Sequence, residues 1–154
     1  MKRILVAAAL LFGLAAGSMI GGTAAHAAET DSPIGSWKTI DDHDGSVRAV
    51  VEIYPVDDEL QGKIVQTFPR PGQEPHVLCE KCSGERKNQP IVGMVFLWRL
   101  KKDGDVWKGG EILDPENGTV YDAKIKLADG GQKLEVRGFL GLSLLGRTQT
   151  WLRQ

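Results

Sequence analysis

The sequence is poor in cysteine and histidine, and neither sign of charge is in excess. It has 2 cysteines, 3 histidines, and 19 basic against 20 acidic residues. This balance gives no reason to expect a nucleic-acid partner, which would require a clustered basic face. Hydrophobic residues make up 42% and charged residues 25% of the chain, proportions that exclude a disordered or collagen-like protein.

Motifs of known catalytic chemistry are also missing. Beyond residue 27 only His43 and His76 remain, and no serine stands in a nucleophile-elbow pattern. Gly138 and Gly141 enclose apolar residues and lack the lysine of a phosphate-binding loop. We therefore predict no catalytic residue, no enzyme activity and no cofactor.

Residues 1–27 have the pattern of a secretory signal peptide. Met1-Lys2-Arg3 is a positive start, residues 4–20 are apolar, and Ala25-His26-Ala27 supplies small residues for cleavage. A transmembrane anchor is the alternative, although glycine and serine dilute the second half of the apolar run. We predict cleavage near Ala27, a periplasmic or secreted protein without a stable membrane span, and a single domain over residues 28–154.

The rest of the chain has no convincing 3.6-residue periodicity but alternates apolar and polar residues between turns. This pattern predicts eight strands, at residues 36–40, 47–54, 60–67, 91–100, 105–113, 119–127, 133–139 and 147–153. Gly109 and Gly110 indicate a bulge or a tight bend within one strand. An open sheet would leave two edges unprotected, so we predict an all-β, eight-stranded antiparallel up-and-down barrel. A two-sheet sandwich is the alternative.

A tryptophan stands near each end of this strand-rich region. Gly35-Ser36-Trp37 opens the first strand, and Trp151-Leu152-Arg153 closes the last. The pair resembles the signature of lipocalins and the wider calycins, in which the first tryptophan lies across the closed end of the barrel. The resemblance implies that a basic residue packs on Trp37 in a cation–π contact, and either Arg153 or Arg147 could supply it.

A second resemblance covers nearly the whole region. Its motifs are long and collinear: residues 35–39 (GSWKT), Cys79-x-x-Cys82, and residues 89–93 (QPIVG), 107–115 (WKGGEILDP), 137–141 (RGFLG) and 146–151 (GRTQTW). They resemble a family of small exported bacterial proteins known as domain of unknown function 2147. The resemblance implies a lipocalin-like barrel that binds a small hydrophobic ligand, and it implies no established reaction.

The two cysteines form a single Cys79-x-x-Cys82 pair. Because two cysteines normally pair in an oxidising compartment, we predict a disulfide that pins the irregular 68–90 segment. A redox-active pair is the alternative, but the Pro-rich surroundings lack the helix that activates such a thiol. With His76 the pair could offer three ligands to zinc. A fourth ligand is not evident, and we predict no metal.

Large apolar residues on the strands are the candidate ligand-binding residues. We predict that the barrel lining or lid includes Met94, Phe96, Trp98, Trp107, Tyr121, Ile125, Phe139, Leu142 and Leu144. The residues on the strands could instead form one outer cover of the barrel, or they could fill the lumen of a small barrel.

Residues 139–146 (FLGLSLLG) carry five large apolar residues where a turn should be polar. They could form a buried plug, a lid at the barrel mouth, or a site that touches lipid or a partner.

Three hypotheses about function follow. The first is a non-catalytic carrier of a small hydrophobic ligand, such as a lipid or fatty acid, in the bacterial envelope. The second is an envelope interaction protein with a solid core. The third is a thiol-disulfide protein that uses Cys79 and Cys82.

Overall fold

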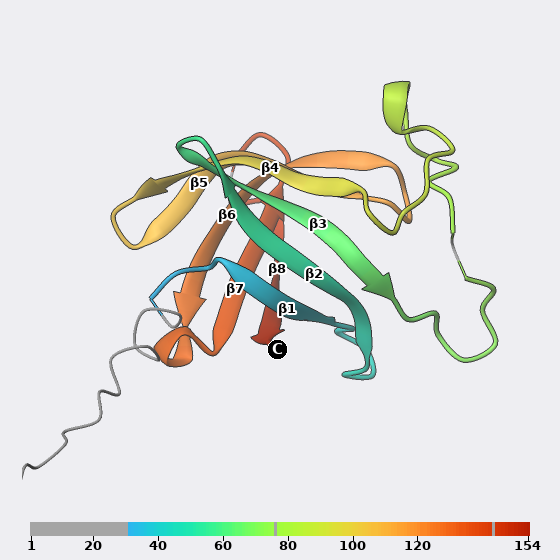
Figure 1. The fold of residues 1–154 in the computed structure, drawn as a ribbon, viewed down its shortest axis with the longest axis horizontal. Coiled ribbons are helices and arrows are strands. Elements are labelled where there is room, and N and C mark those ends of the chain that lie inside the picture. Colours follow the sequence, from blue (N-terminus) through green and yellow to red (C-terminus); the bar gives the residue numbers. More distant parts are fainter. Residues whose placement is uncertain (1–30, 76, 143) are drawn as a thin grey trace, which may run out of the picture.

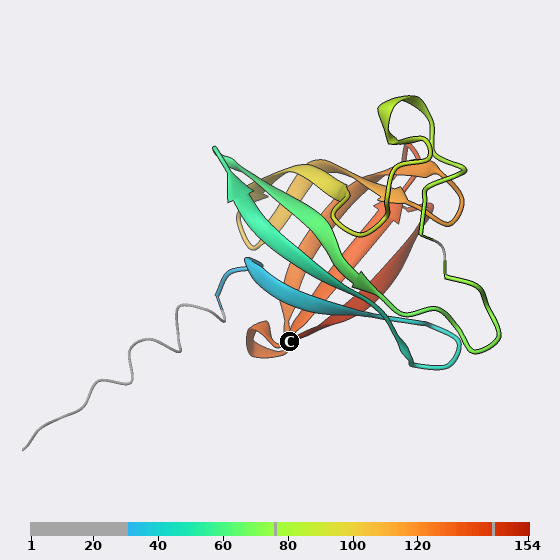
Figure 2. The same ribbon diagram turned by 45° about the vertical axis from the view of Figure 1, so that its right-hand side comes forward.

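The computed structural model describes residues 31–75, 77–142 and 144–154. The predicted signal peptide and His76 lie outside these ranges. Over the described residues, each strand pairs antiparallel with the next, and the last pairs with the first to close a barrel (Figures 1 and 2). The strands are β1 (Gly35–Ile40), β2 (Val47–Val56), β3 (Glu59–Thr67), β4 (Val95–Asp103), β5 (Val106–Asp114), β6 (Thr119–Ala128), β7 (Lys133–Phe139) and β8 (Gly146–Arg153). The prediction of an all-β, eight-stranded barrel is confirmed.

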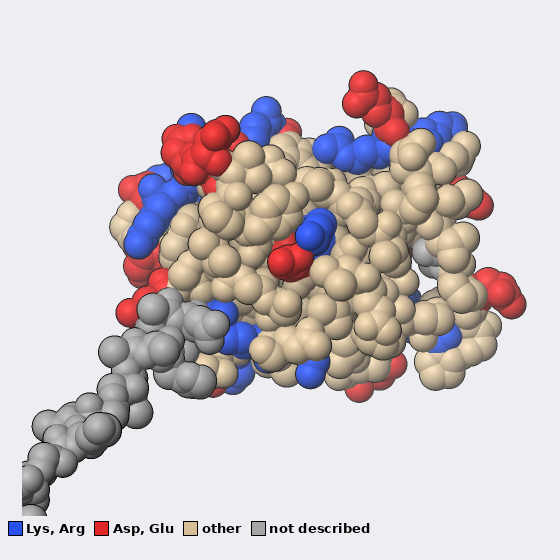
Figure 3. Space-filling model, viewed as in Figure 1, with Lys and Arg blue, Asp and Glu red and all other residues tan. Residues whose placement is uncertain are grey.

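Two short 3-10 helices lie in the connections, η1 at Gly84–Arg86 and η2 at Asp129–Gly131. No helix in the described part of the chain has the length and apolar character needed to cross a bilayer. On the face seen in Figure 3, acidic and basic groups alternate around the edges, and uncharged atoms fill most of the middle.

One predicted strand is shifted along the chain. β4 begins at Val95, not at residue 91, because Gly93 has a φ of 91° and the Met94 N–H donates to the Ile91 carbonyl at 3.1 Å, which makes a turn. β4 then continues to Asp103, which pairs with Val106. The hairpin turn therefore follows Asp103, whereas the sequence pattern had suggested a strand that ends at residue 100.

The predicted bulge at the paired glycines of β5 is confirmed. The register with β6 shifts between Trp107 and Gly110, and Gly109 has a φ of 75°. A Cβ on Gly110 would lie 2.5 Å from the carbonyl oxygen of Trp98, closer than real side chains come. The absence of a side chain at Gly110 therefore lets β4 and β5 approach each other here.

Because consecutive strands are antiparallel, their connections alternate between the two ends of the barrel. The β1–β2, β3–β4, β5–β6 and β7–β8 connections lie at one end, called here the open end. The remaining connections, the start of β1 and the end of β8 lie at the other, called the closed end. The long β3–β4 connection extends beyond the strands (Figures 1 and 2).

The closed end is held by Trp37 and Arg153. Trp37 is fully buried, and the Arg153 guanidinium carbon lies 4.3 Å from its ring centroid. The guanidinium also donates to the carbonyl oxygens of Gly131 at 2.7 Å and Ser32 at 2.8 Å. At Gly35, whose φ is 127°, a Cβ would lie 3.3 Å from Nη1 of Arg153. Glycine at the head of β1 thus leaves room for the guanidinium.

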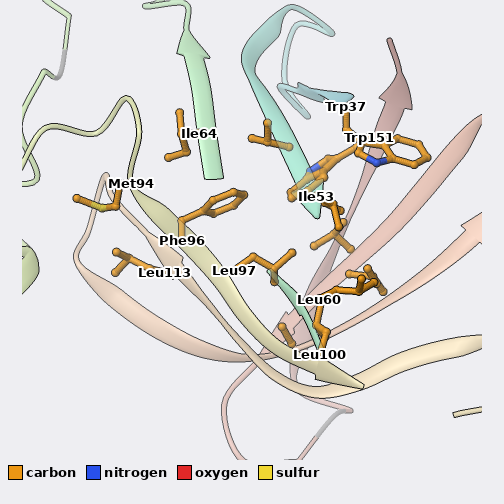
Figure 4. Close-up of a cluster of buried hydrophobic side chains, with 14 of the residues drawn as sticks. Trp37, Ile53, Leu60, Ile64, Met94, Phe96, Leu97, Leu100, Leu113 and Trp151 are labelled. Carbon is orange, nitrogen blue, oxygen red and sulfur yellow. The ribbon is translucent and has the colours of Figure 1, made fainter. Parts of the chain in front are cut away.

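Buried apolar side chains fill the interior next to the closed end. They include Trp37, Ile53, Leu60, Leu100, Trp107, Ile125 and Leu134. Figure 4 shows Trp37 and Trp151 at one side of this cluster and Met94, Phe96 and Leu113 at the other. The burial of this cluster is the main source of stability, because apolar area removed from water contributes roughly 25 cal/mol per Å².

Candidate ligand-binding site

The open end of the barrel leads into a cavity of about 690 Å³. Trp151 closes its inner end, and the ring centroid of Phe96 lies 6.0 Å from that of Trp151. Its other apolar lining residues include Ala49, Val51, Ile64, Ile112 and Val136. The volume falls within the range of roughly 300–1,000 Å³ that is typical of small-molecule sites. The barrel is therefore packed near its closed end and hollow near its open end, and its core is not solid throughout.

Charged side chains surround the mouth of the cavity. Four of them, Asp41, Arg48, Arg70 and Glu116, form a connected group that we call the mouth clasp. The Asp41 side chain is only 2% exposed, and its Oδ2 accepts from Nε of Arg70 at 2.9 Å. Nε of Arg48 lies 3.6 Å from the same oxygen. A buried ion pair is favourable only when hydrogen bonds also satisfy its charged groups, and the Asp41 carboxylate accepts such bonds.

Arg48 extends the mouth clasp to two other segments. Its Nη1 donates to the Phe68 carbonyl oxygen at 2.9 Å, and its Nη2 lies 3.4 Å from Oε1 of Glu116. Arg70 and Phe68 belong to the β3–β4 connection, and Glu116 belongs to the β5–β6 turn. The clasp thus ties three of the open-end connections together around the cavity.

A second ion pair joins the β1–β2 connection to β8. Arg147, at the start of β8, donates through Nε to Oδ2 of Asp42 at 2.8 Å. Both side chains are well exposed, so the pair contributes little to stability. Asp41 and Asp42 are neighbours in the chain, but Asp41 pairs with Arg48 and Arg70, whereas Asp42 pairs with Arg147.

We expect the mouth clasp to make stability depend on acidic pH. The pKa of Asp41 lies below its ordinary value because the His43 N–H donates to the carboxylate; burial opposes this effect, and Arg70 adds to it. A lowered folded-state pKa stabilises the protein above the unfolded-state pKa, near 4. That stability is lost as the pH falls through the folded-state pKa.

The melting temperature measured from about pH 7 to pH 2.5 tests this expectation. The Asp41→Asn variant keeps the size of the side chain but loses the charge. Wild-type protein should therefore lose stability below about pH 4 more steeply than the variant. Other carboxylates titrate in both proteins, so the difference between the two curves isolates Asp41. Curves that stay parallel would contradict the assignment.

Residues 35–153, which include the whole barrel, match a family model described as "Uncharacterized protein conserved in bacteria (DUF2147)". The chain belongs to this family. Among solved structures, it is similar to protein HP1028 from Helicobacter pylori, described as belonging to the lipocalin family. The identity is 20% and the TM-score 0.67, over 80% of this chain and 83% of that chain. The fold of this DUF2147 protein is thus lipocalin-like. No curated protein matches it.

The DUF2147 barrel brings only some of the predicted lining residues to the cavity. Phe96, Tyr121 and Phe139 line it, and the Tyr121 hydroxyl accepts from Nδ2 of Asn117 at 3.3 Å. Met94, Trp107 and Ile125 are buried in the core but do not line the cavity.

Trp98 lies on the outer surface of the barrel. Its Nε1 donates to Oε2 of Glu111 at 2.6 Å, and the guanidinium carbon of Arg86 lies 4.3 Å from the ring. Simple alternation from Phe96 would turn Trp98 inward. The β3–β4 register instead shifts on both sides of Gly62, so that the buried Leu97 pairs with Gly62 and Trp98 faces out. The assignment of Trp98 to the lining is wrong for this reason.

Leu142 and Leu144 do not line the cavity either, and both are largely exposed. Their neighbours Leu140 and Leu145 line its rim. A buried plug over residues 139–146 is therefore wrong, and the β7–β8 connection presents its leucines at the mouth.

The predicted Cys79–Cys82 pair lies at disulfide distance, with Cα atoms 5.3 Å apart. Cys79 is fully buried and Cys82 nearly so, and Sγ of Cys79 lies 3.7 Å from the Pro115 carbonyl oxygen. The backbone of Lys81 also touches Gly118, where a Cβ would meet the Lys81 carbonyl oxygen at 2.0 Å. These contacts pin the β3–β4 connection to the β5–β6 turn, and this burial favours a structural bridge over a redox-active one.

The sequence pattern did not reveal the mouth clasp. Its members come from four separate segments, and each occupies an ordinary turn or strand position. The one indication in the sequence was the length of the irregular 68–90 segment, because a long connection needs contacts that hold it against the barrel.

Proposed function

We propose that this DUF2147 protein binds a small apolar molecule in its cavity and acts as a non-catalytic carrier in the bacterial envelope. The observation that carries the proposal is the cavity of about 690 Å³, with apolar walls from Val51, Ile64, Phe96 and Val136. Enclosing an apolar ligand there would remove its surface from water, which is the dominant favourable term in such binding.

The polarity of the cavity sets the expected orientation of the ligand. Trp151 and Phe96 offer an apolar inner end, whereas Arg48, Arg70 and Arg147 lie at the mouth. An elongated molecule such as a lipid or fatty acid would place its hydrocarbon part inward and its polar group among these side chains. The lipocalin-like fold supports this ligand class, because barrels of this size can hold one small ligand.

Two features of the sequence and structure support the envelope part of the proposal. The pattern of residues 1–27 is that of a cleaved signal peptide. A buried pair of cysteines at disulfide distance is also typical of proteins in oxidising compartments.

Native mass spectrometry tests the carrier function. Protein purified from its own periplasm should carry a reproducible mass excess that disappears on denaturation, and the released molecule should be a lipid or another apolar compound. The neutral probe N-phenyl-1-naphthylamine should bind after this molecule has been removed. A chain with no excess mass that also fails to bind the probe would contradict the proposal.

A further inference from the structure

The β7–β8 connection carries an unusual group of exposed leucines. We call Leu140, Leu142, Leu144 and Leu145 the leucine cluster; their exposed fractions are 58%, 72%, 87% and 74%. Single exposed apolar residues are common, but a contiguous group usually marks a surface that meets a partner or a membrane. None of the four side chains contributes to the barrel core.

The leucine cluster is continuous with the cavity. Leu140 and Leu145 line the cavity rim, whereas Leu142 and Leu144 lie outside it and are largely exposed. The Leu145 N–H donates to the Leu142 carbonyl at 3.0 Å, so the tip satisfies part of its own backbone hydrogen bonding. An apolar path therefore runs from the cavity lining to the outside of the molecule.

Basic side chains stand beside this apolar tip. Nη2 of Arg137 donates to the Leu144 carbonyl at 3.3 Å, and Nη1 donates to Oγ1 of Thr148 at 2.9 Å. Arg147 follows at the start of β8, where Asp42 offsets its charge. Apolar residues flanked by arginines match the layers of a phospholipid surface, where phosphates overlie the acyl chains. Because Arg147 is paired, the leucines rather than net charge must supply most of the attraction.

We propose that the leucine cluster inserts into the surface of a phospholipid bilayer and holds the cavity mouth against it. This activity goes beyond ligand carriage, and it does not require the cavity to be occupied. If both hold, an apolar ligand passes between the bilayer and the cavity without crossing water. We choose a bilayer as the occupant because the leucine cluster is continuous with the apolar cavity mouth and has arginines beside it, as the phosphates of a bilayer lie over its acyl chains.

Vesicle sedimentation tests the proposal. The vesicles contain phosphatidylcholine and phosphatidylglycerol, and the mature chain is used. Wild-type protein should sediment with them, and the double variant Leu142→Asp, Leu144→Asp should partition about tenfold less or worse. The matched control is Leu152→Asp, because Leu152 is an exposed leucine of β8 near the closed end. This control should sediment like the wild type.

Fluorescence provides a direct reading of insertion. In Leu144→Trp, the new indole should shift its emission to shorter wavelength when vesicles are added. The double variant should still bind N-phenyl-1-naphthylamine in the absence of vesicles, which separates membrane contact from the proposed carrier function. Failure of the wild type to sediment, or equal sedimentation of the double variant, would overturn the proposal. So would a dimer that dissociates in the double variant, because the cluster would then join two copies of this chain.

Discussion

Replacement of Gly138 by phenylalanine should abolish binding of an apolar ligand and leave the barrel folded. Gly138 lies in the cavity wall, and a Cβ there would come no closer than 3.5 Å to Ile112 and Tyr121, an ordinary van der Waals contact. The phenyl ring would therefore project into the cavity and occupy the space that a ligand needs. Titration with N-phenyl-1-naphthylamine should give an affinity lower by about tenfold or more, because overfilled sites tolerate little extra volume.

Gly138→Ala is the matched control for this experiment. It adds the same Cβ but leaves almost all of the cavity open, so its affinity should stay close to that of the wild type. Melting temperatures of both variants would show whether the barrel still folds. If the phenylalanine variant folds and binds as tightly as the wild type, then the ligand lies elsewhere on the molecule.

Loss of the Arg153 side chain should produce the largest fall in stability among surface-charge substitutions. In Arg153→Ala the closed end loses a cation–π contact with Trp37 and the hydrogen bonds to the Gly131 and Ser32 carbonyl oxygens. Hydrogen bonds from a charged group contribute about 1.5–3 kcal/mol each, and the stacking adds about 1 kcal/mol. In the variant, water can hydrogen-bond to the carbonyl oxygens that Arg153 leaves, which offsets part of this loss. We therefore expect the free energy of unfolding in urea to drop by about 3 kcal/mol.

Arg147→Ala provides the comparison on the same strand. Its guanidinium pairs with Asp42 at the exposed rim, where such pairs contribute at most about 1 kcal/mol. The two alanine variants should thus differ in stability by at least about 2 kcal/mol. Similar losses for both would mean that the stacking on Trp37 does not hold the closed end.

Local patterns were enough to predict the barrel, whereas its closed end was implied by the resemblance to lipocalins. Strand alternation and turn residues depend on neighbours within a few positions, and the sequence displays both directly. Gly35 and Trp37 form a short motif with a fixed physical role. The choice between Arg153 and Arg147 could not be made from spacing alone, because both residues lie on the last strand on the inward-facing alternation.

The cavity and its rim depend on contacts that the sequence does not display. Asp41 and Arg70 are 29 residues apart, and Arg48 and Glu116 are 68 residues apart. Trp98 was expected among the large apolar lining residues, but the register shifts at Gly62 turn it outward. Register shifts of this kind arise from pairing between strands, and a single strand gives little sign of them.

The closed end also determines how the protein can be handled. Trp37 of β1 pairs with Arg153 of β8, and the Gln154 N–H donates to the Ser36 carbonyl at 3.0 Å. A biotin or dye attached after Gln154 would therefore stand at the pole opposite the mouth. Protein immobilised through such a tag would face the solution with its cavity and leucine cluster free. In that orientation, one sensor surface could measure the binding of an apolar molecule and the binding of a vesicle as separate signals.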